Sequence, residues 1–88
     1  MTEKERSIIR VMSQRGHCAC GHKVGDEFEL TEFVPPGMCS WAFVSLFPFA
    51  SAIQSGGSFP WEKQPERASA ACPDADNPVV FEVRRVLR

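Results

Sequence analysis

Thiol and imidazole side chains are unusually dense in this chain. Its 88 residues include four cysteines and two histidines, which are Cys18, Cys20, Cys39, Cys72, His17 and His22. Thiolates and imidazoles are the ligands that suit zinc, and thiolates alone also suit iron–sulfur clusters. We therefore predict a metal site, with zinc as the candidate ion and Cys18, His22, Cys39 and Cys72 as its ligands.

A shared ion would join three separate regions of the chain, and metal binding of this kind couples directly to folding. Four ligands would make a closed, structural site in an accessory or binding module, whereas three would leave a position open for hydrolytic or Lewis-acid chemistry. The spacing matches no zinc-finger or ribbon pattern, since Cys18 and Cys20 are one residue apart and Cys39 and Cys72 stand alone. Cysteines that fill the core without a metal are the plainer alternative.

Cys39 supports a second interpretation, in which the protein uses thiol chemistry as a redox or catalytic protein. It follows Pro35-Pro36-Gly37-Met38 at the expected start of a helix. Free amides and the positive end of the helix dipole favour a thiolate there, which lowers the thiol pKa and raises reactivity. A histidine from the segment 17–22 could serve as its base or partner.

Composition excludes several classes of protein. Hydrophobic residues are 43% and charged residues 24% of the chain, which is typical of a globular domain and argues against disorder. The formal net charge is −1, so the basic balance expected of a nucleic-acid binder is missing. No apolar run follows the charged first residues, and we expect a cytoplasmic protein. The most apolar stretch, 38–53, is shorter than the roughly 20 residues that span a membrane.

Four strands are expected around one helix. Residues 7–13 are rich in β-branched side chains and predict the first strand. A glycine-rich loop, 14–25, then carries both histidines and two of the cysteines. Val24, Phe28 and Leu30 alternate with polar residues and predict a second strand after the turn at Gly25-Asp26. Segments 67–72 and 79–87 supply the third and fourth strands.

The segment 38–54 has helical length and carries no charged residue. Pro48 lies in its interior and should kink or split the helix, and Gly56-Gly57 provides a C-terminal stop. Apolar side chains occur on nearly every side of this helix, so we expect it to be buried on several sides or shared with a second copy of the chain. A homo-oligomer formed through the apolar 38–55 helix is the partner that this pattern favours.

These elements predict a small α+β fold in which residues 1–88 form a single domain. The expected chain order is β-β-α-β-β, with a mostly antiparallel sheet packed on one long or proline-kinked apolar helix.

The motifs Gly16–Asp26, Pro36–Ala42, Gly56–Trp61, Cys72–Asp74 and Asn77–Glu82 also occur together in this order. In this the chain resembles a family of short, uncharacterised prokaryotic proteins of about the same length. The resemblance implies no activity. It singles out Cys18, His22, Cys39 and Cys72 as members of the shared motifs, and it leaves His17 and Cys20 as features of this sequence.

Overall fold

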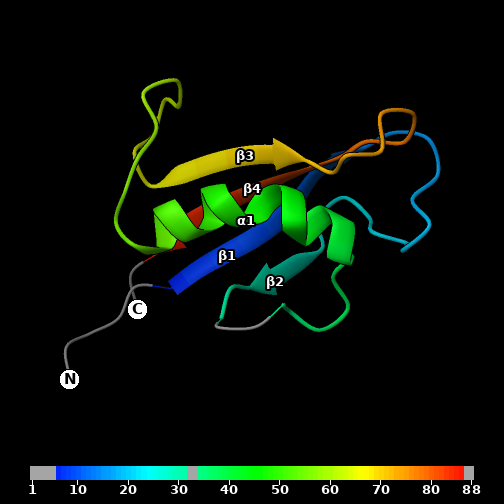
Figure 1. Ribbon diagram of the computed structural model, residues 1–88, viewed down its shortest axis with the longest axis horizontal. Coiled ribbons are helices and arrows are strands. Elements are labelled where there is room, and N and C mark those ends of the chain that lie inside the picture. Colours follow the sequence, from blue (N-terminus) through cyan, green and yellow to red (C-terminus); the bar gives the residue numbers. More distant parts are fainter. Residues whose placement is uncertain (1–5, 32–33, 87–88) are drawn as a thin grey trace.

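The computed structural model describes residues 6–31 and 34–86 and contains four strands and one helix. They follow one another as β1 (Arg6–Gln14), β2 (Glu27–Glu29), α1 (Ser40–Gln54), β3 (Arg67–Ala71) and β4 (Val79–Val86). The strands form one antiparallel sheet in the order β2-β1-β4-β3, and α1 lies across one of its faces (Figure 1). The predicted α+β class and antiparallel sheet are therefore confirmed.

The two long strands β1 and β4 form the centre of the sheet. Their register pairs Ile9 with Val83 and Val11 with Phe81, then shifts by one residue at Met12. Side chains alternate between the faces of a strand, so this register places these four buried side chains together on the face toward the helix. They form the floor of the core.

The helix closes the core with one face. Ala42, Leu46, Ala50 and Ile53 recur at helical spacing, and each is at most 2% exposed. Two small alanines among the four let the helix axis approach the sheet closely. A full burial of Leu46 or Ile53 stabilises the fold by about 1.5–3 kcal/mol each.

Two hydrogen bonds end the helix in a Schellman motif. The amide of Gly57 donates to the Ala52 carbonyl at 2.8 Å, and the amide of Gly56 donates to the Ile53 carbonyl at 3.1 Å. Gly56 has a φ of +93°, which residues with a side chain rarely adopt. The Arg85 guanidinium donates to the Ile53 carbonyl at 2.6 Å and so ties the helix end to β4. The predicted stop at these glycines is confirmed.

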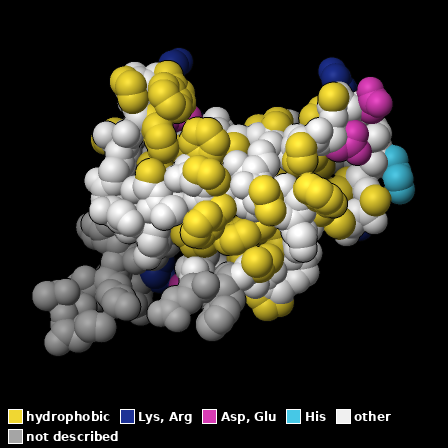
Figure 2. Space-filling model, in the orientation of Figure 1, with side chains coloured by type: hydrophobic (Ala, Val, Ile, Leu, Met, Phe, Trp, Pro, Cys, Tyr) yellow, Lys and Arg dark blue, Asp and Glu magenta, His cyan; other side chains and the backbone are white. Residues whose placement is uncertain are grey.

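The expectation that α1 is buried on several sides is wrong. Trp41, Val44 and Phe47 are 71%, 66% and 48% exposed, because the sheet covers only the opposite face of the helix. Figure 2 shows hydrophobic side chains spread over this side of the molecule. The helix also runs unbroken through Pro48. Val44 and Pro48 both lie on the exposed side, where water can satisfy the carbonyl that Pro48 leaves without a donor.

The strand boundaries differ from the predicted ones mainly at β2. This strand is three residues long, and Val24, expected in its alternating pattern, lies in the preceding loop and is 63% exposed. Backbone hydrogen bonds nevertheless continue beyond both ends of β2, from Leu30 to Ser7 and between Val11 and Asp26. The helix begins at Ser40 rather than at Met38, and the predicted end of the last strand at Leu87 lies outside the described residues.

The sheet face opposite the helix carries ion pairs instead of a second layer. Glu82 accepts from Arg67 at 2.6 Å and from Arg84 at 3.3 Å, while Arg67 also pairs with Glu62. Glu62 in turn accepts a hydrogen bond from the Ser69 amide on the edge strand β3. The unpaired edge of β3 is thus partly covered, which blunts its tendency to pair with another chain. No helix within the described residues is long and apolar enough to cross a bilayer.

Candidate thiol site

Three segments that are distant in sequence meet at one end of the molecule. They are the loop between β1 and β2, the start of α1 and the turn between β3 and β4 (Figure 1). Together they form the walls of a solvent-accessible pocket of about 280 Å³. Its walls are Cys18, Ala19, Cys20, Cys39, Trp41, Cys72, Pro73, Asp74 and Asn77. All four cysteines of the chain therefore line one cavity.

Asn77 holds two of these segments together. Its side-chain oxygen accepts a hydrogen bond from the His17 amide at 2.8 Å, which joins the β3–β4 turn to the β1–β2 loop. The close approach requires glycine at position 16, where an added Cβ would lie 2.2 Å from the same oxygen. Gly16 also has a φ of +72°. The clamp fixes the loop that carries Cys18 and Cys20.

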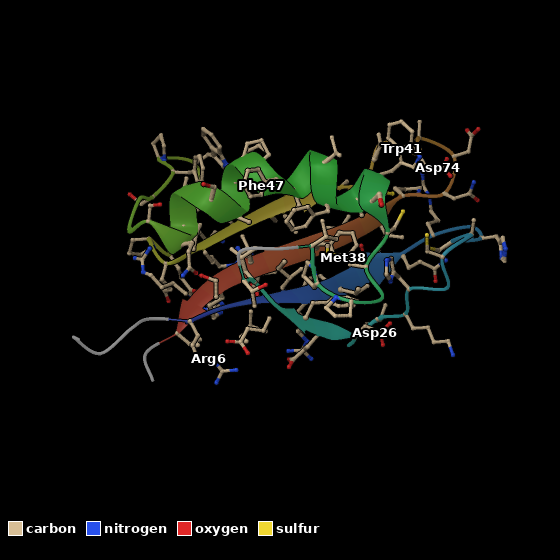
Figure 3. All side chains as sticks on the ribbon, turned by 60° about the horizontal axis from the view of Figure 1, so that its bottom comes forward. Arg6, Asp26, Met38, Trp41, Phe47 and Asp74 are labelled. Carbon is tan, nitrogen blue, oxygen red and sulfur yellow. The ribbon has the colours of Figure 1, made fainter. Side chains whose placement is uncertain are left out.

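Asp74 shapes the turn on the other side of the pocket. Its Oδ1 accepts hydrogen bonds from the amides of Asp76 and Asn77, both at 3.2 Å, and the Asn77 side chain donates to its Oδ2 at 3.2 Å. Such an aspartate-initiated turn explains why the sequence Asp74-x-x-Asn77-Pro78 folds locally. The carboxylate is thereby held at the rim, and Trp41 and Asp74 lie at the same end of the molecule in Figure 3.

Cys72 sits where β3 leads into this turn. Its amide donates to the Val79 carbonyl at 3.0 Å, and the Val79 amide donates to its sulfur at 3.3 Å. Cys18 lies on the opposite wall, in a turn closed by a 2.9 Å hydrogen bond from the Gly21 amide to its carbonyl. Both thiols are half-buried and pack against the core.

His22 supports the site from behind and is absent from the pocket lining. The ring is 4% exposed and meets Phe28 and Phe81 edge-on. Its Nε2 accepts a hydrogen bond from the Cys39 amide at 3.0 Å, which ties the β1–β2 loop to the start of α1. His22 therefore contacts the backbone amide of Cys39, whereas the sequence suggested a histidine as base or partner of the Cys39 thiol.

Cys39 occupies the N-cap position of α1, as predicted from its place after the proline–glycine turn. Its thiol makes no side-chain capping hydrogen bond, but the first-turn amides influence its ionisation. The Ala42 amide and then the Cys20 thiol lower the pKa of Cys39, with a smaller contribution from the Trp41 amide. Burial opposes them. The balance favours a thiolate at Cys39.

Cys20 shows the opposite effect. Its pKa is raised chiefly by the hydrogen-bonding interaction with Cys39, and next by burial and by the negative charge of the Cys39, Cys18 and Cys72 sulfurs. The two pKa shifts run in opposite directions, so the interaction favours ionisation of Cys39 over ionisation of Cys20.

The structure brings Cys18, Cys39 and Cys72 of the predicted metal ligands to one pocket and places His22 outside it. Among residues 6–31 and 34–86, no group of three or more His, Cys, Asp and Glu side chains is arranged to hold a metal ion. Cys20, which was not among the four predicted metal ligands, also lines the pocket. His17 is exposed and takes part through its backbone.

Three residues of the pocket, Trp41, Asp74 and Asn77, were not among the predicted site residues. Asp74 and Asn77 were recognisable as turn residues, but nothing in their spacing indicates that the turn folds against the loop around His17. Trp41 belongs to the helix that was expected to be buried on several sides or shared with a second chain, and it is exposed beside the thiols. These residues could not be recognised from local sequence, because their proximity depends on the antiparallel β1–β4 pairing that brings both loops to the same end of the sheet.

Comparison of the chain with protein-family models, with curated proteins and with solved structures finds no match. The resemblance to a family of short prokaryotic proteins therefore stays a prediction, and the site has to be interpreted from its own chemistry.

Proposed function

We propose that the protein carries out thiol–disulfide exchange, with Cys39 as the attacking thiolate and Cys20 as the second, resolving thiol. The observation that supports this most is the position of Cys39 at the N-cap of α1, in the same open pocket as Cys20. The Ala42 amide and then the Cys20 thiol lower the pKa of Cys39, and Cys39 raises the pKa of Cys20. An open pocket gives a small molecule access to both sulfurs. With this activity the protein would belong to the thiol-based redox proteins.

The reaction begins when the Cys39 thiolate attacks one sulfur of a disulfide. A new sulfur–sulfur bond forms to Cys39, the original bond breaks, and the leaving thiolate takes a proton from solvent. The start of α1 contributes by raising the fraction of Cys39 present as thiolate, which is the attacking species.

Mixed-disulfide formation then changes the state of Cys20. The largest cause of its raised pKa is the interaction with Cys39, and this cause disappears once the Cys39 sulfur is bonded. The Cys20 thiol can now ionise and attack the Cys39 sulfur, which releases the second half of the substrate as a thiol. Two cysteines become one disulfide, and the substrate disulfide is reduced to two thiols.

Alkylation with less than one equivalent of iodoacetamide, followed by peptide mass analysis, tests the assignment. Cys39 is expected to be modified first, several-fold faster than the other cysteines near neutral pH. Cys39→Ser should remove the fast phase, and Cys72→Ser is the matched control that should keep it. Treatment with a small disulfide should then form a Cys20–Cys39 bond. Uniformly slow labelling of all four thiols would overturn the proposal.

Zinc binding is a second candidate function, favoured by the presence of four thiols around one cavity. Thiolates are good zinc ligands, but the side chains would have to move into a tetrahedral arrangement. Elemental analysis of the untagged protein, with a count of free thiols, separates the two functions. About one zinc per chain, lost together with the fold on chelation, would support the metal. Metal-free protein with titratable thiols would support exchange chemistry.

The proposed chemistry requires reduced cysteines, and all four are free. A reducing compartment keeps them so, and we therefore propose a cytoplasmic location. We also propose that the exposed side chains Trp41, Val44 and Phe47 mediate self-association of the chain, because large apolar side chains gathered on one helix face commonly mark an interface.

A further inference from the structure

The charges around the pocket define which disulfides it accepts. Among the described residues that line it, Asp74 is the one charged side chain, and the lining includes no lysine, arginine or histidine. The other walls are apolar or thiol groups, apart from the uncharged Asn77. A substrate that enters therefore meets a carboxylate and a thiolate without a cationic side chain to balance them.

Asp74 is fixed in its position. The amides of Asp76 and Asn77 and the Asn77 side chain bind its two carboxylate oxygens. These contacts hold the charge at the rim of the cavity instead of letting it swing away. A fixed charge discriminates between ligands more strongly than one on a mobile side chain, since no reorganisation relieves the repulsion.

The positive end of α1 does not offset this charge. A helix N-terminus is equivalent to roughly half an elementary charge. At this site Cys39 already lies at that terminus and its thiolate uses the stabilisation. With Cys39 ionised, a thiolate and a carboxylate face about half a positive charge, so the pocket remains net negative.

We propose that the pocket selects small disulfides with neutral or cationic substituents and discriminates against anionic ones. This inference rests on the proposed exchange function and adds its substrate class. The substituent lies between Trp41, Ala19 and Pro73, which provide apolar contact, and passes Asp74 at the rim. In each case Cys39 attacks one sulfur, one half of the substrate leaves as a thiol, and Cys20 releases the other half.

Three aliphatic disulfides of similar size test the selection: cystamine, hydroxyethyl disulfide and dithiodiglycolate, which are cationic, neutral and anionic. Each rate of protein disulfide formation, measured by mass spectrometry at low salt, is divided by the rate of the same disulfide with a neutral model thiol. This division removes the different intrinsic reactivities of the three reagents. We expect the normalised rate for the anionic reagent to be about three- to tenfold below that for the neutral one.

Asp74→Asn is the decisive variant because asparagine keeps an acceptor oxygen for the two amides of the turn and removes the charge. It should raise the normalised rate of the anionic reagent to about that of the neutral one. Asp76→Asn removes an equal charge two residues away, outside the pocket lining, and should change little. Urea unfolding confirms that both variants fold.

Different results would overturn the charge selection and the exchange function. Equal normalised rates for all three disulfides in the wild-type protein, or an Asp74→Asn variant that does not change them, would overturn the charge selection and leave exchange at Cys39 intact. Modification at a cysteine other than Cys39, or rates no faster than the model thiol with every reagent, would overturn the exchange function itself.

Discussion

Cys20 and Cys39 influence each other more than either is influenced by burial. Their interaction raises the pKa of Cys20 and lowers the pKa of Cys39. Removing the partner thiol should therefore move the remaining pKa toward its ordinary value. The effect depends on a donor at position 20 and not on sulfur as such, which allows the donor to be tested with an isosteric hydroxyl.

Cys20→Ala is expected to slow alkylation of Cys39 about two- to fivefold near neutral pH, because the thiolate fraction of Cys39 falls when the donor is lost. Cys20→Ser retains a hydrogen-bond donor and should preserve most of the wild-type rate. The rate is followed against pH by mass analysis of the Cys39 peptide. Wild-type rates in both variants would show that the Ala42 and Trp41 amides lower this pKa without help from Cys20.

The lowered pKa of Cys39 also makes stability depend on pH. Folding favours the thiolate, so the stabilising contribution of this group is fully present above the pKa of the unfolded thiol and is lost as the pH falls through the lower, folded pKa. The difference in unfolding free energy between wild type and Cys39→Ser should therefore increase as pH rises toward the ordinary thiol pKa. Urea unfolding under reducing conditions measures it, and Cys72→Ser provides the control. A difference that shrinks with rising pH contradicts the assignment.

The sequence predicted the position of Cys39 at a helix start, which depends on a local signal. It proposed Cys18, Cys39 and Cys72 as parts of one site from their residue type alone, and the structure brings them to one pocket together with Cys20. It did not predict the function of His22. A histidine close to cysteines in sequence suggests a ligand, but the ring is buried between Phe28 and Phe81 and binds an amide. That use depends on tertiary packing, which the local sequence does not contain.

Among the structural elements, the two loops at the end of the sheet depend on one close contact. Gly16→Ala would force a Cβ to within 2.2 Å of the Asn77 oxygen, in addition to the strain of its positive φ. Gly21 has a similar φ of +78° with no atom near an added Cβ, so Gly21→Ala carries the strain alone. We expect a loss of about 1–2 kcal/mol for Gly21→Ala and a larger loss for Gly16→Ala. Urea unfolding compares the two, and equal losses would show that the clamp contributes little.

Pro48 is the least favourable residue of the helix for its position. Replacement by alanine restores a donor for the Val44 carbonyl and removes a poor helix former at an exposed site. Pro48→Ala should therefore stabilise the fold by about 1–3 kcal/mol and leave Cys39 alkylation unchanged, since Pro48 is distant from the helix start. Thermal unfolding detects the gain. A destabilised variant would show that the proline ring makes a packing contribution outweighing the missing hydrogen bond.

The element boundaries show which signals were sufficient. Alternation and β-branched residues located β1 and β4 within one residue of their ends where the structure describes them, because both strands are long and half-buried. The pattern overextended the second strand, since Val24 continues the alternation but points to solvent. Pro48 was expected to kink or split the helix. The helix is not split, because the rest of the segment packs as one face against the sheet, and this packing outweighs one missing hydrogen bond.

For the whole molecule, the sequence left open what covers the apolar helix. A single sheet can cover one side of a helix only, so the composition of 38–55 left two solutions, a more enclosed core or a second chain. The structure places α1 on one face of a four-stranded sheet and leaves Trp41, Val44 and Phe47 exposed. Of the two solutions, the second is therefore the one that the exposed face supports.

Self-association through this face is tested with two matched valines. Val44 on the helix and Val24 in the β1–β2 loop are 66% and 63% exposed. Wild-type protein should elute at a larger apparent mass as its concentration rises, because association follows mass action. Val44→Lys should shift that transition to higher concentration by placing a charge in the apolar contact, whereas Val24→Lys adds the same charge elsewhere and should not. Samples are kept reduced so that intermolecular disulfides do not mimic association. Monomeric elution of the wild type at every concentration would refute the interface, and equal shifts in both variants would assign the association to net charge instead of the helix face.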